Sequence, residues 1–360
     1  MKVRFCSPIK SHMGYAELGR IIINQLVQAG YQVAVHEIPV KVVDVDYGAL
    51  GEQAQRLLSL DVDAEVNVVN MIPPLFERFR LPGARNIGYS MFETDRLPDD
   101  WVLACNRMDA IWVPSDWVRS VFIASGVTVP VSVVGVDAIS MPVAEPAAGP
   151  LRLLSVFQWS ARKNPQNLLR AYCAAFDGHT DTVLTLKVHR HTDAEKSRSF
   201  VQNAINYSLS RTRPRRALPR IEIATEHYSS AQIRQLHADS HAFVSLSHGE
   251  GWGLPAWEAT LSGKPVIHTG WSAPVEFVHE QGLVKSNLSP AYGMEEFVPY
   301  YDMGMNWGEP QLDDAVAKLR DLHANYARWF KTSREHRNII NNRYSLDRRI
   351  QQIRQAISIA

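Results

Sequence analysis

Short runs of Val, Ile and Leu alternate with segments of helical periodicity along the whole chain. This alternation is typical of parallel α/β structure, in which apolar strands are buried and helices connect them. In the first half, strands are predicted over 2–6, 32–37, 65–69, 84–89, 110–113 and 131–134, and helices over 16–29, over 99–107 and from Ser115. Leu18, Ile22 and Leu26 share one face of the first helix, and a glycine follows it as a C-terminal stop.

The stretch 141–150, MPVAEPAAGP, interrupts this pattern and predicts a domain boundary. It holds three prolines and a glycine and has no periodicity. Beyond it the alternation restarts, with strands predicted over 151–157, 182–188, 220–224, 242–246 and 265–268, helices between them, and helix throughout 312–360. The pattern therefore predicts two doubly wound α/β domains with a cleft between them.

Composition narrows the function classes. A chain of 360 residues exceeds one ordinary core, which agrees with two domains. The formal net charge of +1 disfavours general coating of polyanions such as nucleic acid. Cys6, Cys105 and Cys173 lie far apart and in no metal spacing, so buried free thiols in a reducing compartment are expected. No run has the apolar length of a signal peptide or a membrane span, so we expect a cytoplasmic protein, with attachment to a membrane surface left open.

The segment 245–264, SLSHGEGWGLPAWEATLSGK, is the richest in candidate chemistry. A predicted strand ends there, and a glycine-dense loop leads into a helix near Leu254 with Pro255 in its first turn. Glycines let the backbone approach a ligand, and the new helix points its N–H groups the same way, which suits an anion such as a diphosphate. Glu250 and Glu258, eight residues apart, are expected to face one cleft. The plainer alternatives are a tight connection and a solvated helix carboxylate.

The run 251–256, GWGLPA, also fits the G-x-G-x-x-A fingerprint of dinucleotide-binding proteins. That fingerprint requires an acidic residue for the ribose at the end of the next strand. Here the next strand ends in His268, Thr269 and Gly270, without a carboxylate, and the first loop of the other domain lacks G-x-G-x-x-G. A nicotinamide-dependent enzyme is therefore disfavoured.

The block HGEGWGLPAWEATLSGKPVI resembles the E-x7-E signature of retaining, nucleotide-sugar-dependent glycosyltransferases of the GT-B fold, the GT4-like group 1 family. Both glutamates, the glycines, Leu254-Pro255 and the trailing GKPVI are in place. The segments FQWSARKNPQNLLRAY, HADSHAFVSLS and DAIWVPSDWVRSVFIASGV resemble the same family. The resemblance covers nearly the whole chain and is strongest over about 85–280.

The resemblance implies a domain organisation and an activity. Residues 1–142 are expected to form an acceptor-side Rossmann-like domain, and 151–335 a nucleotide-sugar-binding one, facing each other across a cleft. Residues 336–360 are expected to return to the N-terminal domain as a helix, for which 344–357 is suited. The implied activity is retaining transfer from a UDP- or GDP-sugar without metal or other cofactor. The acceptor stays open between a glycan, a lipid-linked sugar, a small molecule and a nucleic acid, as does the oligomeric state.

The resemblance also implies roles for individual residues of the second domain. The first glutamate of the signature, Glu250, is expected on hydroxyls of the donor sugar, and the second, Glu258, on the nucleotide ribose. Lys163 matches the lysine of a basic pair that neutralises the leaving diphosphate. The arginine of that pair is Gln158 here, and Arg162 is the candidate to replace it as a catalytic cation. Backbone N–H groups of the turn are expected to line the sugar and phosphate; the turn residues are Gly251, Trp252, Gly253 and Leu254.

In the first domain, Gly14 and Tyr15 occupy the loop that meets the diphosphate in the family, and Tyr15 is an acceptor-side candidate. Glu93, after a predicted strand, is a second candidate for acceptor contact; a helix-capping carboxylate is an equal alternative. A protein nucleophile is not implied. Two other functions stay open: a sugar-nucleotide epimerase of the same fold, and a non-catalytic nucleotide-sugar-binding protein.

Four weaker signals complete the sequence. His237 and His241 have the i, i+4 spacing of a zinc pair, although His241 is predicted to begin a strand. Asp44-Val45-Asp46 resembles the D-x-D of metal-dependent transferases but fits a loop better. The basic run 211–216 suits an anionic acceptor, a membrane headgroup or a solvated helix end. Trp307-Gly308-Glu309-Pro310 resembles a W-x-E-P element of one branch of these transferases and has no assigned role.

Overall fold

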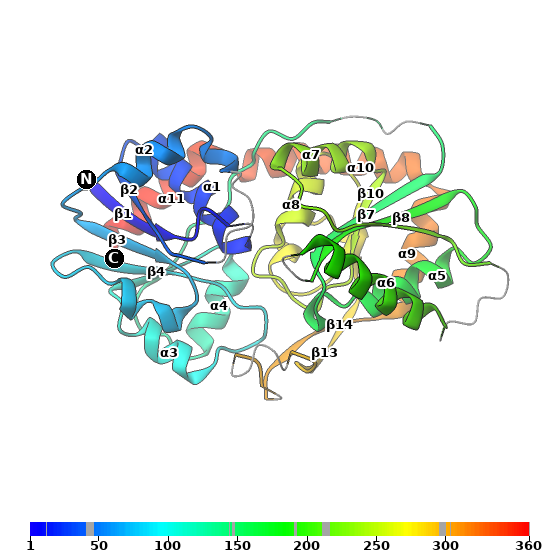
Figure 1. Ribbon diagram of the computed structural model, residues 1–360, viewed down its shortest axis with the longest axis horizontal. Helices are drawn as coiled ribbons and strands as arrows, with labels where there is room; N and C mark the ends of the chain where they lie inside the picture. Colours follow the sequence, from blue (N-terminus) through cyan, green and yellow to red (C-terminus); the bar gives the residue numbers. More distant parts are fainter. Residues whose placement is uncertain are drawn as a thin grey trace. The chain divides into compact units, whose positions relative to one another are not determined.

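The computed structural model describes residues 1–11, 13–40, 47–143, 145, 148–190, 193–210, 217–294, 300–302 and 304–359. By their internal contacts the residues form two compact units. The first unit comprises Met1–Ala138 and Asn342–Ala360, and the second comprises Ile139–Asn341. Each unit contains one six-stranded parallel sheet (Figure 1).

The sheet of the first unit has the strand order β2-β1-β3-β4-β5-β6. Its strands are β1 Lys2–Ser7, β2 Gln32–Glu37, β3 Val66–Asn70, β4 Arg85–Tyr89, β5 Ala110–Val113 and β6 Val131–Val133. All neighbouring pairs are parallel. β2 lies on one side of β1, and β3, β4, β5 and β6 follow one another on its other side. The strand order therefore reverses between β1 and β3.

The α-helices of the first unit are α1 Gly14–Gln28, α2 Gln53–Ser59, α3 Asp99–Cys105, α4 Asp116–Ala124 and, from the C-terminus, α11 Leu346–Ile359. α11 packs against α1 and β6, and Figure 1 shows it in red beside the blue helix. Arg349 fixes this return of the chain, because its Nε donates to the carbonyl of Val136 at 3.1 Å and its guanidinium lies 4.4 Å from the ring centroid of Tyr344. The backbone N–H of Ala138 donates to the carbonyl of Tyr344 at 2.7 Å.

The sheet of the second unit has the order β12-β11-β10-β7-β8-β9. Its strands are β7 Leu151–Gln158, β8 Thr182–His189, β9 Arg220–Ala224, β10 Ala242–Ser245, β11 Val266–Thr269 and β12 Leu283–Val284. Their pairing is parallel throughout. Here the order reverses between β7 and β10, the arrangement of the Rossmann fold.

Helices cover both faces of this second sheet. The α-helices are α5 Pro165–Ala175, α6 Ala194–Ser210, α7 Ser230–Asp239, α8 Leu254–Leu261, α9 Leu312–Ala324 and α10 Tyr326–Arg343. In Figure 1, α5, α6 and α9 lie on one side of the sheet and α7 and α8 on the other. Apolar side chains of α5, α6 and α9 share one buried core with β7, β8 and β10. An antiparallel hairpin, β13 Ser286–Pro290 with β14 Asn306–Pro310, is added outside the sheet.

The sequence predicts domains over 1–142 and 151–335 and a returning helix over 336–360. The first unit ends at Ala138, and residues up to Asn341 belong to the second. The late return has a physical reason: His336 Nε2 donates to the carbonyl of Phe277 at 2.8 Å, and the Arg337 guanidinium donates to the carbonyl of Leu261. Both bonds hold α10 to the second unit.

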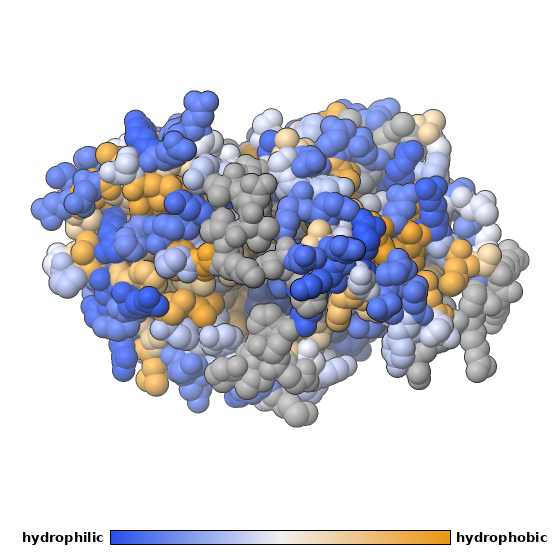
Figure 2. All heavy atoms as spheres, in the orientation of Figure 1, coloured by the Kyte–Doolittle hydropathy of each residue, from blue (hydrophilic) through white to orange (hydrophobic). Residues whose placement is uncertain are grey.

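Hydrophilic side chains cover most of the surface that each unit presents in Figure 2, with apolar ones interspersed. None of the helices in the described ranges combines the length and apolar character that crossing a membrane requires. The three cysteines are free and buried, as the sequence predicts. Burial raises the pKa of both the Cys6 and the Cys173 thiols to about 11.

Candidate active site

The reversal of strand order in the second unit brings two loops together. In doubly wound sheets ligands bind beyond the carboxyl ends of the strands at such a point. β7 is followed by the 3-10 helix Ala161–Lys163, and β10 is followed by the loop 246–253, which leads into α8. The predicted basic residues and the predicted glycine turn therefore lie at the same edge of one sheet.

The turn into α8 depends on the conformation of Gly253. This residue precedes the helix with φ 90° and ψ 57°, in the left-handed region, and a Cβ on it would lie 3.3 Å from Pro274 Cγ. Pro255 lies in the first turn, where a missing N–H costs no helical bond. The backbone N–H groups at this end of α8 are thus available to an anion.

Trp252 contributes to this turn through its backbone rather than its indole. The side chain is only 3% exposed, and its ring centroid lies 5.3 Å from that of Trp257 and 5.0 Å from that of Phe277. These aromatic contacts anchor the turn in the core of the unit. They leave its main chain at the carboxyl edge of the sheet.

Glu250 lies at the centre of an ion-pair cluster. Lys163 Nζ donates to its two carboxylate oxygens at 2.6 and 2.7 Å, and Arg162 Nη1 donates to Oε2 at 3.2 Å. Burial alone would raise the pKa of Glu250, but the charges of Lys163 and Arg162 outweigh it and lower the pKa to about 2. The carboxylate is therefore ionised at neutral pH, although the residue is 8% exposed.

Backbone bonds hold this cluster in place. The guanidinium of Arg162 also donates to the carbonyl of Gly249 at 2.7 Å, while the carbonyl of Arg162 accepts from the N–H of His248 at 2.8 Å. The N–H of Glu250 donates to Ser272 Oγ at 2.9 Å. Gln158, by contrast, ends β7 with an exposed side chain. Arg162, and not Gln158, therefore accompanies Lys163 at Glu250.

Glu258 lies on α8 and contacts a histidine of the preceding helix. His237 Nε2 lies 3.2 Å from Glu258 Oε2, and His237 is 1% exposed. His241 lies outside α7, and its Nδ1 accepts from the N–H of Arg152 at 3.1 Å. The zinc pair considered from the spacing of His237 and His241 is therefore not formed, because the helix ends before the second histidine.

The element Trp307–Pro310 supports the signature loop, a role that its sequence did not indicate. In β14, the Trp307 ring stacks on the His248 imidazole with centroids 4.5 Å apart and planes 7° apart. The N–H of Gly308 donates to the carbonyl of His248 at 2.9 Å, and His248 Nδ1 donates to the carbonyl of Gly308 at 3.1 Å. Burial lowers the pKa of His248 to about 4, so the imidazole is neutral at pH 7. Glu309 accepts from Asn167 Nδ2 at 2.7 Å.

The candidates of the first unit lie at its own reversal of strand order. Gly14 begins α1 directly after the loop that follows β1. The Tyr15 hydroxyl lies 2.8 Å from Ser90 Oγ beyond β4, and the carbonyl of Tyr15 accepts from Asn70 Nδ2 at 2.7 Å. Burial raises the pKa of the Tyr15 hydroxyl, which keeps it protonated. Glu93 follows the same strand as Ser90 and is half-buried.

The sequence pattern did not identify Ser90 or Asn70 as candidate site residues, although each directly follows a predicted strand. The position after a parallel strand is the available signal for such residues. The D-x-D at Asp44 and Asp46 and the basic run 211–216 lie outside the described residues.

Solved structures show what this architecture is similar to. HepE from Anabaena, in complex with UDP and glucose, matches with a TM-score of 0.66 at 15% identity, over 100% of both chains. Sucrose-phosphate synthase from Thermosynechococcus elongatus matches with a TM-score of 0.68 at 13% identity, over 99% of this chain and 98% of the other. These proteins are GT-B glycosyltransferases. The chain has the GT-B fold.

This structural similarity confirms the GT-B fold that the resemblance of the signature block predicted. The larger TarM from S. aureus matches with a TM-score of 0.58 at 12% identity, and the chain spans only 57% of its length. No protein-family model matches the chain, and no curated protein matches it by sequence. At these identities the similarity establishes the GT-B fold alone.

Proposed function

We propose that this protein is a glycosyltransferase that moves a sugar from a UDP- or GDP-sugar to an acceptor, with retention of anomeric configuration and without a metal ion. The observation that carries the proposal is the buried, ionised Glu250 held by Lys163 and Arg162 beside the N-terminus of α8. A glycosyl donor presents both charges that this cluster can complement. Its diphosphate is anionic, and its sugar ring becomes cationic during transfer.

Lys163 and Arg162 are proposed to stabilise the diphosphate as it leaves. Glu250 neutralises one of these two positive charges. A diphosphate brings more negative charge than one carboxylate, so it competes for the same cations and is also favoured by the helix N-terminus. In this proposal Lys163 and Arg162 shift toward the phosphates when the donor binds.

Glu250 is then proposed to accept hydrogen bonds from sugar hydroxyls. Because its pKa is about 2, it cannot deliver a proton at neutral pH, which makes a general acid an unsuitable role. A fixed negative charge beside an oxocarbenium-like ring strengthens its interaction in the transition state. Glu258, held by His237, is proposed to bind the ribose, which does not change during the reaction.

The transfer step breaks the bond between the anomeric carbon and the phosphate oxygen, and the bonding electrons leave with the nucleoside diphosphate. The acceptor oxygen forms the new bond to the anomeric carbon. Its proton passes to the departing phosphate, so no protein nucleophile is required. The two cations stabilise the negative charge of the leaving diphosphate, which a bound metal ion does in metal-dependent enzymes, so a metal ion is not required.

UDP and sugar bound to HepE, and the O-GlcNAc transferase GtfA in complex with UDP and GlcNAc, support a nucleotide-sugar donor. Gly14 is proposed as a further diphosphate contact, and Tyr15 and Glu93 as acceptor-side residues. The acceptor class, contact with a membrane surface and a cytoplasmic location remain expectations of the sequence.

A panel of UDP, GDP and their sugars tests the proposal in two stages. A ligand at 100 times its dissociation constant stabilises the folded protein by about 2.7 kcal/mol, so the donor is identified by its shift of the unfolding midpoint. Release of free nucleoside diphosphate is then followed without acceptor. Slow release is expected from a transferase. Stabilisation without any release, with or without candidate acceptors, would instead indicate a non-catalytic binding protein.

A further inference from the structure

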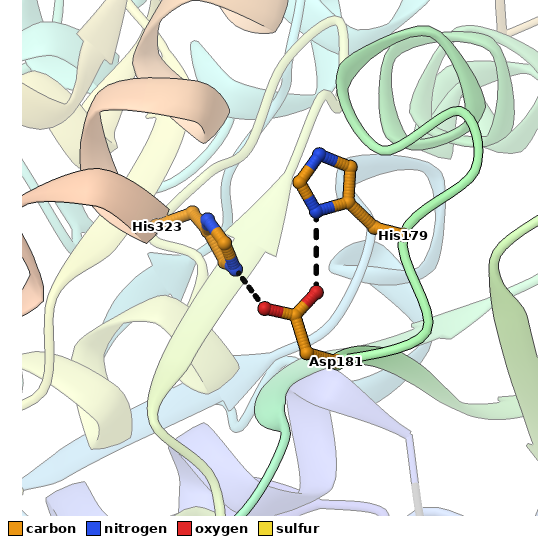
Figure 3. Close-up of side chains that lie close together, drawn as sticks. All are labelled: His179, Asp181 and His323. Carbon is orange, nitrogen blue, oxygen red and sulfur yellow. Dashed lines mark hydrogen bonds and ion pairs between the residues drawn. The ribbon is translucent and has the colours of Figure 1, made fainter.

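Two histidines and an aspartate of the second unit lie close together, far from the candidate active site. His179 Nδ1 lies 3.2 Å from Asp181 Oδ1, and His323 Nε2 lies 2.9 Å from Asp181 Oδ2. The two imidazoles flank the carboxylate and direct a ring nitrogen to different oxygens of it (Figure 3). All three potential ligand atoms lie within 4.8 Å of one another.

The backbone that carries these side chains is well anchored. The carbonyl of Asp181 accepts from the N–H of Leu151 at 2.7 Å, which attaches the residue to the start of β7. The N–H of His179 donates to the carbonyl of Phe176 at 2.9 Å. His323 lies in the last turn of α9, and Arg320 of the same helix donates to the carbonyl of Ala174 at 2.8 Å. Three separate bonds thus fix both sides of the cluster.

An aromatic side chain also restrains the two imidazoles. Phe176 is 1% exposed, and its ring meets His179 and His323 edge-on, with centroids 5.9 and 5.6 Å apart. The two imidazole centroids lie 5.2 Å from each other. Because both rings pack on one rigid wall, their nitrogens are held toward Asp181 before any ligand arrives. Such preorganisation lowers the cost of binding an ion.

We propose that His179, Asp181 and His323 form a binding site for a divalent transition metal of the zinc class. Imidazole nitrogen and carboxylate oxygen are the donor atoms that Zn²⁺ takes, at about 2.0–2.2 Å, and a tetrahedral set at that distance has its ligands about 3.4 Å apart. With one ligand atom taken from each residue, the three atoms lie within 4.8 Å of one another, so the side chains close on that spacing as the ion binds. Each neutral imidazole binds the ion through the nitrogen nearest Asp181, and its single proton is then carried on the other ring nitrogen, which it reaches through solvent. Water completes the coordination.

The position of this site separates it from catalysis. Asp181 precedes β8, whereas the Glu250 loop follows the carboxyl end of β10 in the same parallel sheet. The eight residues of β8 span about 26 Å at about 3.3 Å per residue. The histidine cluster therefore lies at the amino ends of the strands, and the Glu250 loop lies at their carboxyl ends. The ion would join the end of α9 to the loop before β8. The inference is therefore independent of the proposed transferase activity.

The test uses the whole protein stripped of metal with a chelator, then titrated with Zn²⁺ by calorimetry and with Co²⁺ by its visible absorption. One ion per chain is expected, and Asp181→Asn and His323→Gln should each weaken it more than about 10-fold. The control is His279→Gln in the His279–His336 pair, whose rings lie 5.1 Å apart without a described carboxylate between them. It should bind as the wild type does.

Two further measurements keep the outcome unambiguous. The unfolding midpoint in chelator shows that each variant folds, and Zn²⁺ should raise it in the wild type and the control but not in Asp181→Asn. Affinity for nucleoside diphosphate should be the same in all variants. Absence of a bound ion in the wild type, or equal binding by Asp181→Asn, would overturn the proposal and leave Asp181 as a hydrogen-bond bridge.

Discussion

Glu250 is the residue at which burial and charge oppose each other most directly. Removing a carboxylate from water is costly, and two cations within 3.2 Å offset that cost in this position. The cluster carries positive charge that a phosphorylated ligand can use. The same pairs that stabilise the folded protein are therefore the ones that binding of the donor rearranges.

Replacement of Lys163 by alanine should weaken the binding of nucleoside diphosphate. A charge-assisted hydrogen bond contributes about 1.5–3 kcal/mol, which corresponds to a 10- to 150-fold loss of affinity by calorimetry. Lys196→Ala, an exposed lysine of α6, is the matched control and should bind as the wild type does. Unchanged affinity in Lys163→Ala would remove the diphosphate from this part of the second unit.

The depressed pKa of Glu250 predicts a stability that is lost in acid. Its pKa falls from an ordinary 4.5 to about 2 in the folded protein, so the unfolded state binds the proton more tightly. The contribution is fully present above pH 4.5 and disappears as the pH falls through about 2. Denaturant unfolding of the wild type and Glu250→Gln across this range measures it. The wild type should lose stability relative to the variant on acidification, and a constant difference would contradict the ion pairs.

At the scale of elements, the alternating pattern was sufficient to predict most of the sheets. The predicted strands 32–37, 110–113 and 220–224 have the bounds of β2, β5 and β9. Their apolar runs are short, rich in Val, Ile and Ala, and bounded by polar residues. The basic segment, by contrast, was singled out by the family resemblance, and it joins the glycine loop in the structure because carboxyl ends of parallel strands share an edge.

Elements and contacts that depend on tertiary structure were not predicted. β12 has two residues and no periodicity, and β13 and β14 are paired across a long connection. The segment 312–360, predicted to be helical throughout, forms three helices, which are separated at Asn325 and at Tyr344-Ser345. His237 and Glu258 belong to different helices, and His323 lies 142 positions beyond Asp181. One sequence holds no local signal for such partners.

The pairing of α7 with α8 gives His237 a positioning role. His237→Phe removes the donor at Glu258, so the KM for the nucleotide sugar should rise about 3- to 10-fold while kcat changes little, as expected for one hydrogen bond. His237→Gln, which can still donate, should recover part of the loss. In Glu258→Gln the further change His237→Phe should have little added effect. Additive losses in the double variant would show that the two residues act separately.

At the scale of the whole molecule, two doubly wound units reproduce the GT-B fold at 13–15% identity to known structures. Fold is retained at this distance because the core needs only apolar residues of suitable size at strand and helix positions. Substrate choice depends on a few side chains, which such similarity does not fix. The donor and acceptor must therefore be measured.

Catalysis should proceed without a divalent metal. Lys163, Arg162 and the N-terminus of α8 provide positive charge for the diphosphate, so turnover in excess EDTA should equal turnover with Mg²⁺. The rate of nucleoside diphosphate release in the two buffers is the readout. Abolition by EDTA and recovery with one metal would assign that charge to an ion, and Asp44 and Asp46 would be the first residues to test.

The separate roles of the two signature glutamates are best tested by comparing Glu250→Gln with Glu258→Gln in donor turnover and in affinity for bare nucleoside diphosphate. We expect Glu250→Gln to lower kcat about 100-fold or more and to retain or strengthen diphosphate affinity, because the variant frees both cations and the ligand has no sugar to lose. Glu258→Gln should weaken that affinity and mainly raise KM. The reverse pattern, or full turnover in Glu250→Gln, would contradict sugar transfer at this cluster.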